Sequence, residues 1–175
     1  ELNNIKINSS LIKIKKKKNL FFVNGKFLHD RKNFEIEELK QIFNNLPNDM
    51  DIKKIEFSSK NNFSFNVSKN LKFDNFKVES IIDLNQLIYK AKNLSLKTYF
   101  PNFTEEVKLE EHKIVINYNK NKFDIKGEGN ILLGDKKDNL LYQITKDGTS
   151  ISFDSKINLK NNLLLIDFLD YEKKE

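Results

Sequence analysis

The sequence contains no cysteine and no tryptophan, and it has only two prolines and five glycines. Without cysteine the chain can form no disulfide, no thiolate nucleophile and few of the common structural zinc sites. No apolar run reaches the roughly 18 residues of a membrane-spanning helix, and no secretion signal is recognisable. We therefore expect this segment neither to span a membrane nor to carry a targeting signal. No linker rich in proline, glycine or serine divides the chain into domains.

Lysine carries almost all of the positive charge. The formal net charge is +6, and Arg31 is the only arginine. Lys15–Lys18 is the only run of four basic residues, and acidic residues are interspersed along most of the sequence. Nucleic-acid readers rely on arginine for bidentate base contacts and on aromatic platforms beside a basic groove. This composition argues against a nucleic-acid partner.

Motifs that would indicate catalysis or metal binding are missing. His29 and His112 are far apart and belong to no cluster with ligand spacing. No nucleophile elbow, phosphate loop, HExxH or EF-hand pattern occurs. Gly127 and Gly129 are superficially like a phosphate cradle, but no helix follows them, and in a strand Gly129 would leave room for His112. We expect no enzyme activity, no metal and no cofactor.

Alternation of apolar and polar residues dominates the second half of the sequence. From Ile114 to Tyr171 apolar residues recur at every second position through five runs. A period of two places alternate side chains on opposite faces of a strand, so the pattern predicts a β-meander with one apolar face and one face in water. The turns that we expect are Lys120-Asn121, Lys136-Lys137, Asp147-Gly148 and Lys160–Asn162. The resulting register pairs Tyr118 with Phe123, Leu133 with Leu140, Ile144 with Ile151, and Leu159 with Leu163.

The last predicted strand differs from the others. Leu163 and Leu165 continue the common apolar face, but Leu164, Ile166 and Phe168 make the reverse face apolar as well. A strand that is apolar on both sides is normally covered on both sides. We expect other parts of the protein to pack there.

The first 104 residues are less regular. Asn24-Gly25 predicts a hairpin, and the three- and four-residue spacing of apolar residues predicts a helix over Glu35–Asn45. Short strands with turns at Ser59–Asn61 and Asp74-Asn75 are expected to follow, then a helical stretch after Asp83. The irregular passage Asn93–Thr104 is expected to be a lateral insertion or a crossover. We also expect a β-bulge near Glu110-Glu111, because Val107 and Leu109 are out of phase with Ile114.

These patterns predict a mainly β protein, an antiparallel meander curved into an open trough or half-barrel, with one or two short helices. The expected organisation is a single segment, 1–175, with irregular hairpins and a helix in 1–50, short strands and a crossover in 51–104, and the regular meander in 105–171. Because strand-like sequence begins almost at Glu1, we interpret the chain as a fragment of a larger, repetitive protein.

From about Phe76 to its end the sequence resembles the AsmA-like superfamily, in the branch with the TamB- and YhdP-like envelope proteins. The stretches that carry the resemblance are residues 99–134, which include the I-x-G-x-G texture at Ile125–Gly129, and residues 167–174. The resemblance implies a bacterial protein anchored in the inner membrane, whose long grooved β-sheet crosses the periplasm and moves phospholipid toward the outer membrane. The membrane anchor would lie outside this segment.

An apolar sheet face must be covered by another layer or offered to an apolar ligand. One alternative is a structural or adhesive β-domain that buries this face in a closed core, and periodicity alone does not separate the two. The resemblance favours an open groove that binds the acyl chains of phospholipids or other lipids. The residues expected to bind them are Ile114, Ile116, Tyr118, Phe123, Ile125, Ile131, Tyr142, Ile144, Ile151, Phe153 and Ile157.

Overall fold

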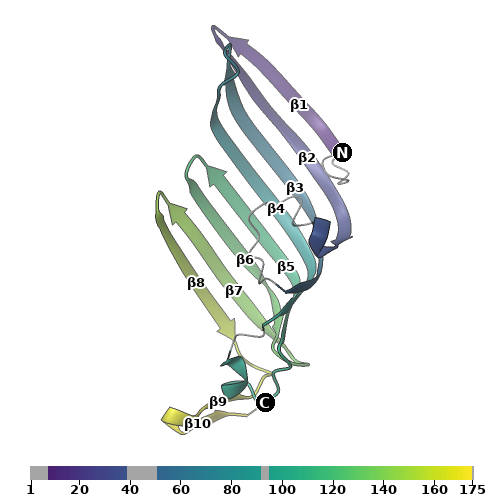
Figure 1. The fold of residues 1–175 in the computed structure, drawn as a ribbon, viewed down its shortest axis with the longest axis vertical. Helices are drawn as coiled ribbons and strands as arrows, with labels where there is room; N and C mark the ends of the chain where they lie inside the picture. Colours follow the sequence, from purple (N-terminus) through teal and green to yellow (C-terminus); the bar gives the residue numbers. More distant parts are fainter. Residues whose placement is uncertain (1–7, 39–50, 92–94, 175) are drawn as a thin grey trace.

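The computed structural model describes residues 8–38, 51–91 and 95–174 (Figure 1). Eight of its strands form one sheet in sequence order, and each strand is antiparallel to the next. They are β1 (Asn8–Lys17), β2 (Leu20–Phe34), β3 (Ile52–Ser68), β4 (Phe73–Lys90), β5 (Glu106–Asn119), β6 (Lys122–Leu132), β7 (Lys137–Asp147) and β8 (Ser150–Asn158). The predicted fold class, an antiparallel meander that stays open, is confirmed, because β1 and β8 lie at opposite ends of the sheet.

A smaller sheet follows the meander. It pairs β9 (Leu164–Ile166) with β10 (Tyr171–Lys173), and the short 3₁₀ helix η2 (Asp167–Leu169) joins them. A second 3₁₀ helix, η1 (Ser95–Thr98), lies between β4 and β5.

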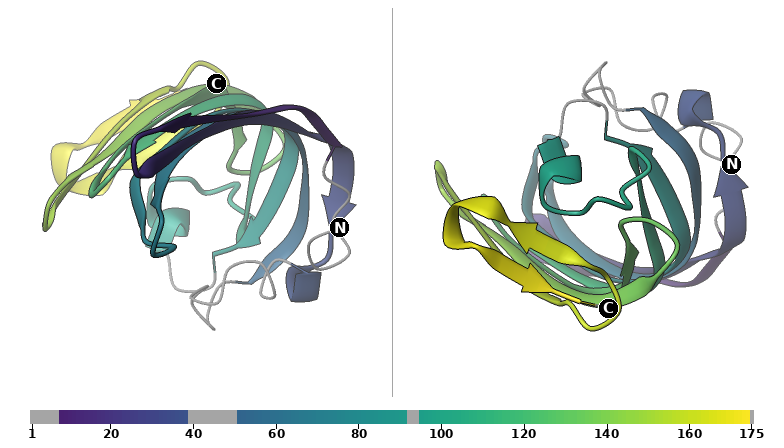
Figure 2. Two further views of the ribbon diagram at one scale, coloured as in Figure 1. Left: turned by 90° about the horizontal axis from the view of Figure 1, so that it is seen from above. Right: turned by 90° about the horizontal axis from the view of Figure 1, so that it is seen from below.

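The main sheet is curved, and Figure 2 shows it wrapping part of the way around the segment that contains η1. Register shifts interrupt the ladders between β2 and β3, between β3 and β4, and between β5 and β6. Such bulges bend a strand and increase its twist, which accounts for the curvature. One shift falls between Glu110 and Lys113, where Glu111 has a φ of 56°. The predicted bulge at Glu110-Glu111 is therefore confirmed.

The sheet has two different margins across the strand ends. Four tight connections lie at one margin, which we call the hairpin margin: Lys18-Asn19, residues 69–72, Lys120-Asn121 and Gly148-Thr149. The opposite margin carries the connections at 35–51, 91–105 and 133–136, and we call it the connection margin.

Most of the apolar side chains of the strands lie on the concave face. Near the connection margin Leu109 and Ile131 are directly opposite each other and pack with Phe103 of the connection that contains η1. That connection lies inside the curve of the sheet (Figure 2), so the face shared by these residues is the concave one. Strand alternation then assigns every other residue of the ladders to this face.

The tightly packed core is small and lies at the connection margin. One cluster contains Ala91, Phe103, Ile131 and Leu133, with Leu96 and Phe100 packed against it from the η1 segment. A second cluster is built on Phe34, which is 2% exposed and packs with Ile36, Ile55 and Phe57. The rest of the concave face has no comparable cluster among the described residues.

The expectations for the first 104 residues are wrong in several places. Asn24-Gly25 is no turn, because Gly25 lies in the middle of β2, paired with Ile12 and Phe63. Instead of short strands, β3 and β4 are 17 and 18 residues long, and β4 continues to Lys90 where a helical stretch was expected. Ladder pairing with neighbours on both sides overrides these weak local signals. Asn75, with a φ of 55°, marks a bulge within β4 and not a turn.

The predicted helix over Glu35–Asn45 falls largely outside the described residues. Ile36–Glu38 are helical in the structure.

Two of the predicted registers in the second half are also wrong. Leu132 pairs with Lys137 across a four-residue connection, so Leu133 does not face Leu140. The last turn is Gly148-Thr149, which pairs Ile144 with Phe153 and not with Ile151. Both errors shift the partner by an even number of residues, and an even shift keeps every side chain on its predicted face. The predicted register at Lys120-Asn121 is confirmed, with Tyr118 opposite Phe123.

The meander ends at β8, so the prediction of a further strand paired through Leu159 and Leu163 is wrong. The Asp138 carboxylate is the physical reason. It accepts hydrogen bonds from the backbone N–H groups of Lys160, Asn161 and Asn162, at 2.7, 2.9 and 3.2 Å, and turns the chain away from the sheet. Leu164–Ile166 then pairs with β10, and Phe168 is 79% exposed, not covered.

Candidate functional site: an open apolar trough

The residues predicted to bind acyl chains come together on the concave face. Ladder pairing places Ile116, Ile125, Ile144 and Phe153 in one row across β5, β6, β7 and β8. Tyr118 and Phe123 lie opposite each other in the next row toward the hairpin margin. The sequence places these side chains here because large apolar residues recur at every second position along these parts of the strands.

This part of the concave face is open to solvent. Of the eleven predicted residues only Ile131 is buried, at 6% exposure, and it belongs to the core cluster under the η1 segment. Ile151 and Phe153 on β8 are 65% and 64% exposed. The remaining predicted side chains are partly exposed. A closed core would bury such side chains almost completely, so the face as described is a trough.

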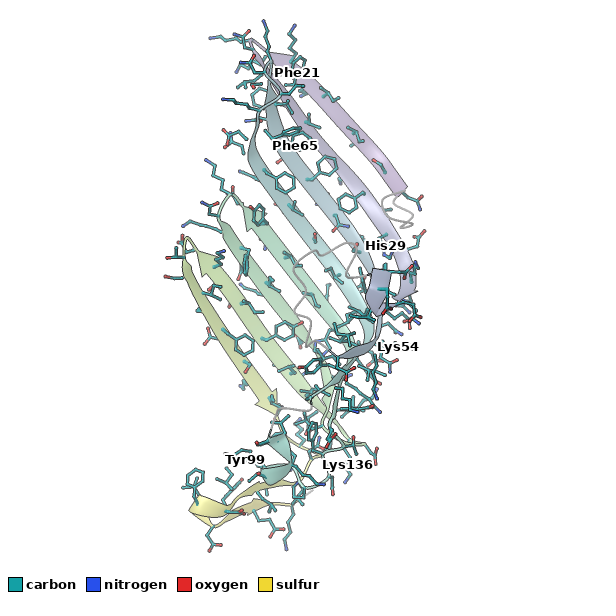
Figure 3. All side chains as sticks on the ribbon, in the orientation of Figure 1. Phe21, His29, Lys54, Phe65, Tyr99 and Lys136 are labelled. Carbon is teal, nitrogen blue, oxygen red and sulfur yellow. The ribbon has the colours of Figure 1, made fainter. Side chains whose placement is uncertain are left out.

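The trough extends over β1 to β4, which the sequence-based site did not include. Aromatic rings continue it from strand to strand: Phe27 contacts Phe63 at 6.1 Å, Phe65 contacts Phe76 at 6.3 Å, and Phe76 contacts Tyr118 at 5.9 Å between ring centroids. Figure 3 shows Phe65 toward the upper end of the sheet. On β1, Ile12 and Ile14 are 58% and 65% exposed. The alternation at Phe63, Phe65 and Val67 was the signal that could have revealed this part.

A polar patch interrupts the apolar surface between its two halves. Ser59, Asn61 and Ser80 lie on the concave side of β3 and β4 and are less than 10% exposed. Asn61 donates a hydrogen bond to the Ser59 hydroxyl at 2.9 Å. Because these polar residues break the apolar alternation, the sequence suggested a turn at Ser59–Asn61. For the same reason the sequence did not indicate that the apolar face continues across β3 and β4.

Two histidines lie on the concave face beside bulges. His112 packs on Tyr142, with ring centroids 5.9 Å apart, and its Nε2 is 2.9 Å from the carbonyl oxygen of Asn130. Burial lowers the pKa of His112, and the Asn130 hydrogen bond offsets this in part. Burial also lowers the pKa of His29, whose ring lies against those of Phe34 and Phe57, with centroids 5.1 and 5.3 Å away. Neutral imidazoles in apolar surroundings fill space here, as expected for His112 beside Gly129.

The described residues contain no group of three or more His, Asp or Glu side chains placed to hold a metal ion. Among the same residues, no helix has the length and apolar character needed to cross a membrane.

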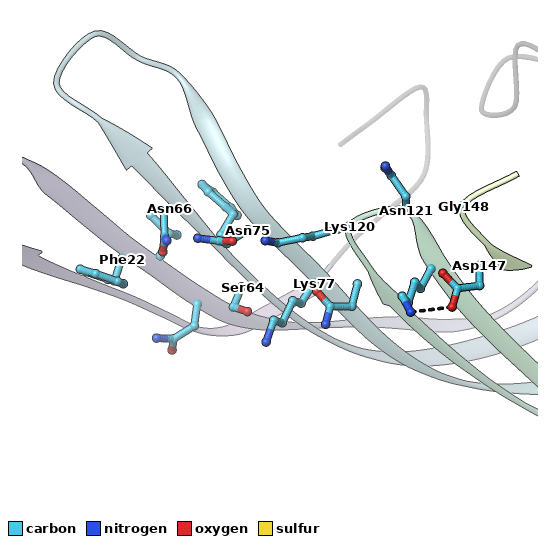
Figure 4. Close-up of a pocket in the computed structure, with 14 residues that line it drawn as sticks. Phe22, Ser64, Asn66, Asn75, Lys77, Lys120, Asn121, Asp147 and Gly148 are labelled. Carbon is cyan, nitrogen blue, oxygen red and sulfur yellow. Dashed lines mark hydrogen bonds and ion pairs between the residues drawn. The ribbon is translucent and has the colours of Figure 1, made fainter.

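A polar depression of about 880 Å³ lies at the hairpin margin (Figure 4). Residues of β2, β3 and β4 meet the turns at Lys120-Asn121 and Gly148 around it. Among the described residues its lining includes five asparagines and three lysines, with Asp147 as the one acidic residue: Asn24, Asn66, Asn75, Asn119, Asn121, Lys77, Lys120 and Lys122. The Lys122 ammonium lies 2.6 Å from the Asp147 carboxylate. Amides and ammonium groups are hydrogen-bond donors, so this depression suits an anionic group.

No protein-family model matches the sequence, and neither the curated proteins nor the solved structures contain a match to it.

Proposed function

We propose that this chain is a segment of a lipid-transport protein of a bacterial envelope, and that its concave face binds the acyl chains of phospholipids or other lipids. In this proposal the segment lies in the periplasm and belongs to a protein anchored in the inner membrane by parts outside the segment. The AsmA-like resemblance suggests the compartment, whereas the trough suggests the ligand. The proposed role is passive: the side chains bind the lipid and none of them is proposed to catalyse a reaction.

The observation that carries the proposal is the accessibility of a continuous row of large apolar side chains. Ile116, Ile125, Ile144 and Phe153 span four strands on one face, and Phe153 is 64% exposed. Covering each methylene of an acyl chain contributes about 0.8 kcal/mol. A chain laid along the trough would therefore gain several kcal/mol from apolar burial alone.

One end of the trough is closed. The η1 segment packs Phe103 over Ile131 and Leu133, and Leu165 of β9 donates a backbone hydrogen bond to the Tyr99 carbonyl at 2.9 Å. Figure 3 shows Tyr99 at the lower end of the molecule. Acyl chains would therefore lie between the η1 segment and the hairpin margin, with headgroups in water at the rim.

The rival function, a structural or adhesive β-domain, requires the same face to be buried in a closed core. A photo-crosslinking amino acid at Ile116, on the concave face, tests between them in the full-length protein in cells. Lys126 provides the matched position, because it lies on the neighbouring strand with its side chain 60% exposed on the convex face. We expect a phospholipid adduct at position 116 and none at 126. Equal labelling at both positions, or no adduct at 116, would contradict acyl binding.

A further inference from the structure

The positive charge of the chain is concentrated at the hairpin margin. The four segments that build this margin, residues 15–20, 68–77, 118–123 and 145–150, contain ten lysines and two aspartates, a net charge of +8. The whole chain has a net charge of +6. The remaining residues are therefore slightly acidic as a group. The positive electrostatic potential of the molecule is strongest at the hairpin margin.

Large apolar side chains are exposed among these lysines. Leu71 and Phe73, in and beside the β3–β4 connection, are 76% and 71% exposed, and Lys69 and Lys72 flank Leu71 in the sequence. The pairing of Leu20 with Ser68 places the β1–β2 turn beside the β3–β4 connection, and Figure 1 shows the two connections together at one end of the sheet. We call this end, with the lysines at 15–18, 69 and 72 and the exposed Leu71 and Phe73, the tip. Apolar side chains surrounded by cations are typical of protein surfaces that insert into the headgroup region of a bilayer.

We infer that the hairpin margin docks on an anionic membrane surface. The lysines lie against lipid phosphates, Leu71 and Phe73 enter the headgroup layer, and the polar depression lined by Lys77, Lys120 and asparagines receives a headgroup. A nucleic acid fits less well, because Arg31, the only arginine, lies outside the four margin segments. This inference does not depend on acyl binding by the concave face.

The absence of tryptophan allows a direct test with the whole chain. Phe73→Trp places a single fluorophore at the tip, and Leu141→Trp places one on the convex face, where Leu141 is 39% exposed. Vesicles of phosphatidylcholine mixed with phosphatidylglycerol should shift the emission of the Phe73→Trp protein to shorter wavelength, and pure phosphatidylcholine should not. The Leu141→Trp protein should show no shift. An unchanged spectrum for Phe73→Trp, or the same shift for both proteins, would overturn the inference.

Charge placement is tested by two triple variants of equal net charge. Lys16→Gln, Lys69→Gln and Lys72→Gln remove charge from the tip. Lys60→Gln, Lys126→Gln and Lys156→Gln remove it from strands away from the tip. A lysine near an anionic bilayer contributes about fivefold in affinity, so the tip variant should bind the mixed vesicles about 100-fold more weakly, and the matched variant should bind like the parent.

Equal losses in the two variants would assign binding to net charge alone and contradict docking by this margin. Displacement of the parent protein from vesicles by duplex DNA at equal phosphate concentration would also contradict it and indicate a nucleic-acid partner. Acyl binding is measured separately, with fatty acid below its micelle concentration, so either proposal can fail alone.

Discussion

The Tyr142 ring lies directly over Gly127, so that a β carbon at position 127 would overlap its Cζ and hydroxyl oxygen. The two residues are opposite each other on β6 and β7. Gly129 has the same relationship with the His112 ring of β5. The two glycines of β6 thus receive one ring from each neighbouring strand. The Tyr142–Gly127 contact belongs to the β6–β7 register that the sequence did not predict.

Gly127→Ala should destabilise the protein by about 1–3 kcal/mol, because the Tyr142 ring must leave its position. Urea unfolding followed by circular dichroism measures this. Tyr142→Leu in the same chain removes the overlapping atoms, so the double variant should lose less than the sum of the two single losses. Strict additivity would contradict the contact.

Gly148→Val tests the last turn of the sheet. Gly148 has a φ of 60°, and a β carbon added to it would meet no other atom within 4 Å, so the cost is one of backbone conformation. A β-branched residue at positive φ should lower the free energy of unfolding by about 1 kcal/mol or more. Thr149→Val is the matched control, since Thr149 is already β-branched. Equal stability of Gly148→Val and the parent would argue against this turn.

Apolar alternation in the sequence predicted the structure better than turn dipeptides did. Alternation at Ile114, Ile116 and Tyr118 specified both strand type and face, and errors of an even number of residues at Lys136-Lys137 and Asp147-Gly148 left that face intact. Turn positions were less well determined, because Asn24-Gly25 satisfies a hairpin pattern although Gly25 is needed to admit the Phe63 ring. Local chemistry does not reveal such packing.

Long-range contacts account for the other errors. The end of the meander depends on Asp138, whose partners Lys160–Asn162 are more than 20 residues away in sequence. The extension of the candidate site to Phe27 and Phe65 depends on pairing across the polar patch at Ser59 and Asn61. Contacts between residues so far apart in sequence leave no local pattern. The sequence therefore located only the half of the trough in which the apolar alternation is unbroken.

Arginine substitutions distinguish the open part of the trough from its closed end. Ile116→Arg and Phe153→Arg should cost no more than about 1 kcal/mol, because the guanidinium can reach water at the open face. Leu133→Arg should cost about 4 kcal/mol or more, since Leu133 is 3% exposed in the core cluster and the charge would be buried without a partner. Denaturant unfolding of the three variants checks this. Similar large losses at all three sites would indicate a closed core.

Stability should depend on pH through His112. Burial lowers the pKa of His112 below its ordinary value of 6.5, so as the pH falls through that value the unfolded chain takes up a proton before the folded chain does. The free energy of unfolding should therefore fall between about pH 7 and about pH 5. His112→Gln, whose amide can still donate to the Asn130 carbonyl, should reduce the slope but not abolish it, because the pKa of His29 is lowered as well. An unchanged slope would contradict a buried neutral His112.

Fluorescence quenching by a lipid measures directly whether an acyl chain lies on the concave face. Phe153→Trp and Asp154→Trp each provide a single fluorophore, at adjacent exposed positions of β8 on opposite faces of the sheet. A fatty acid brominated along its chain and kept below its micelle concentration quenches only a tryptophan that it touches. If acyl chains bind on the concave face, quenching should be saturable for Phe153→Trp and absent for Asp154→Trp. Equal quenching of the two proteins, or none in either, would contradict acyl binding on this face.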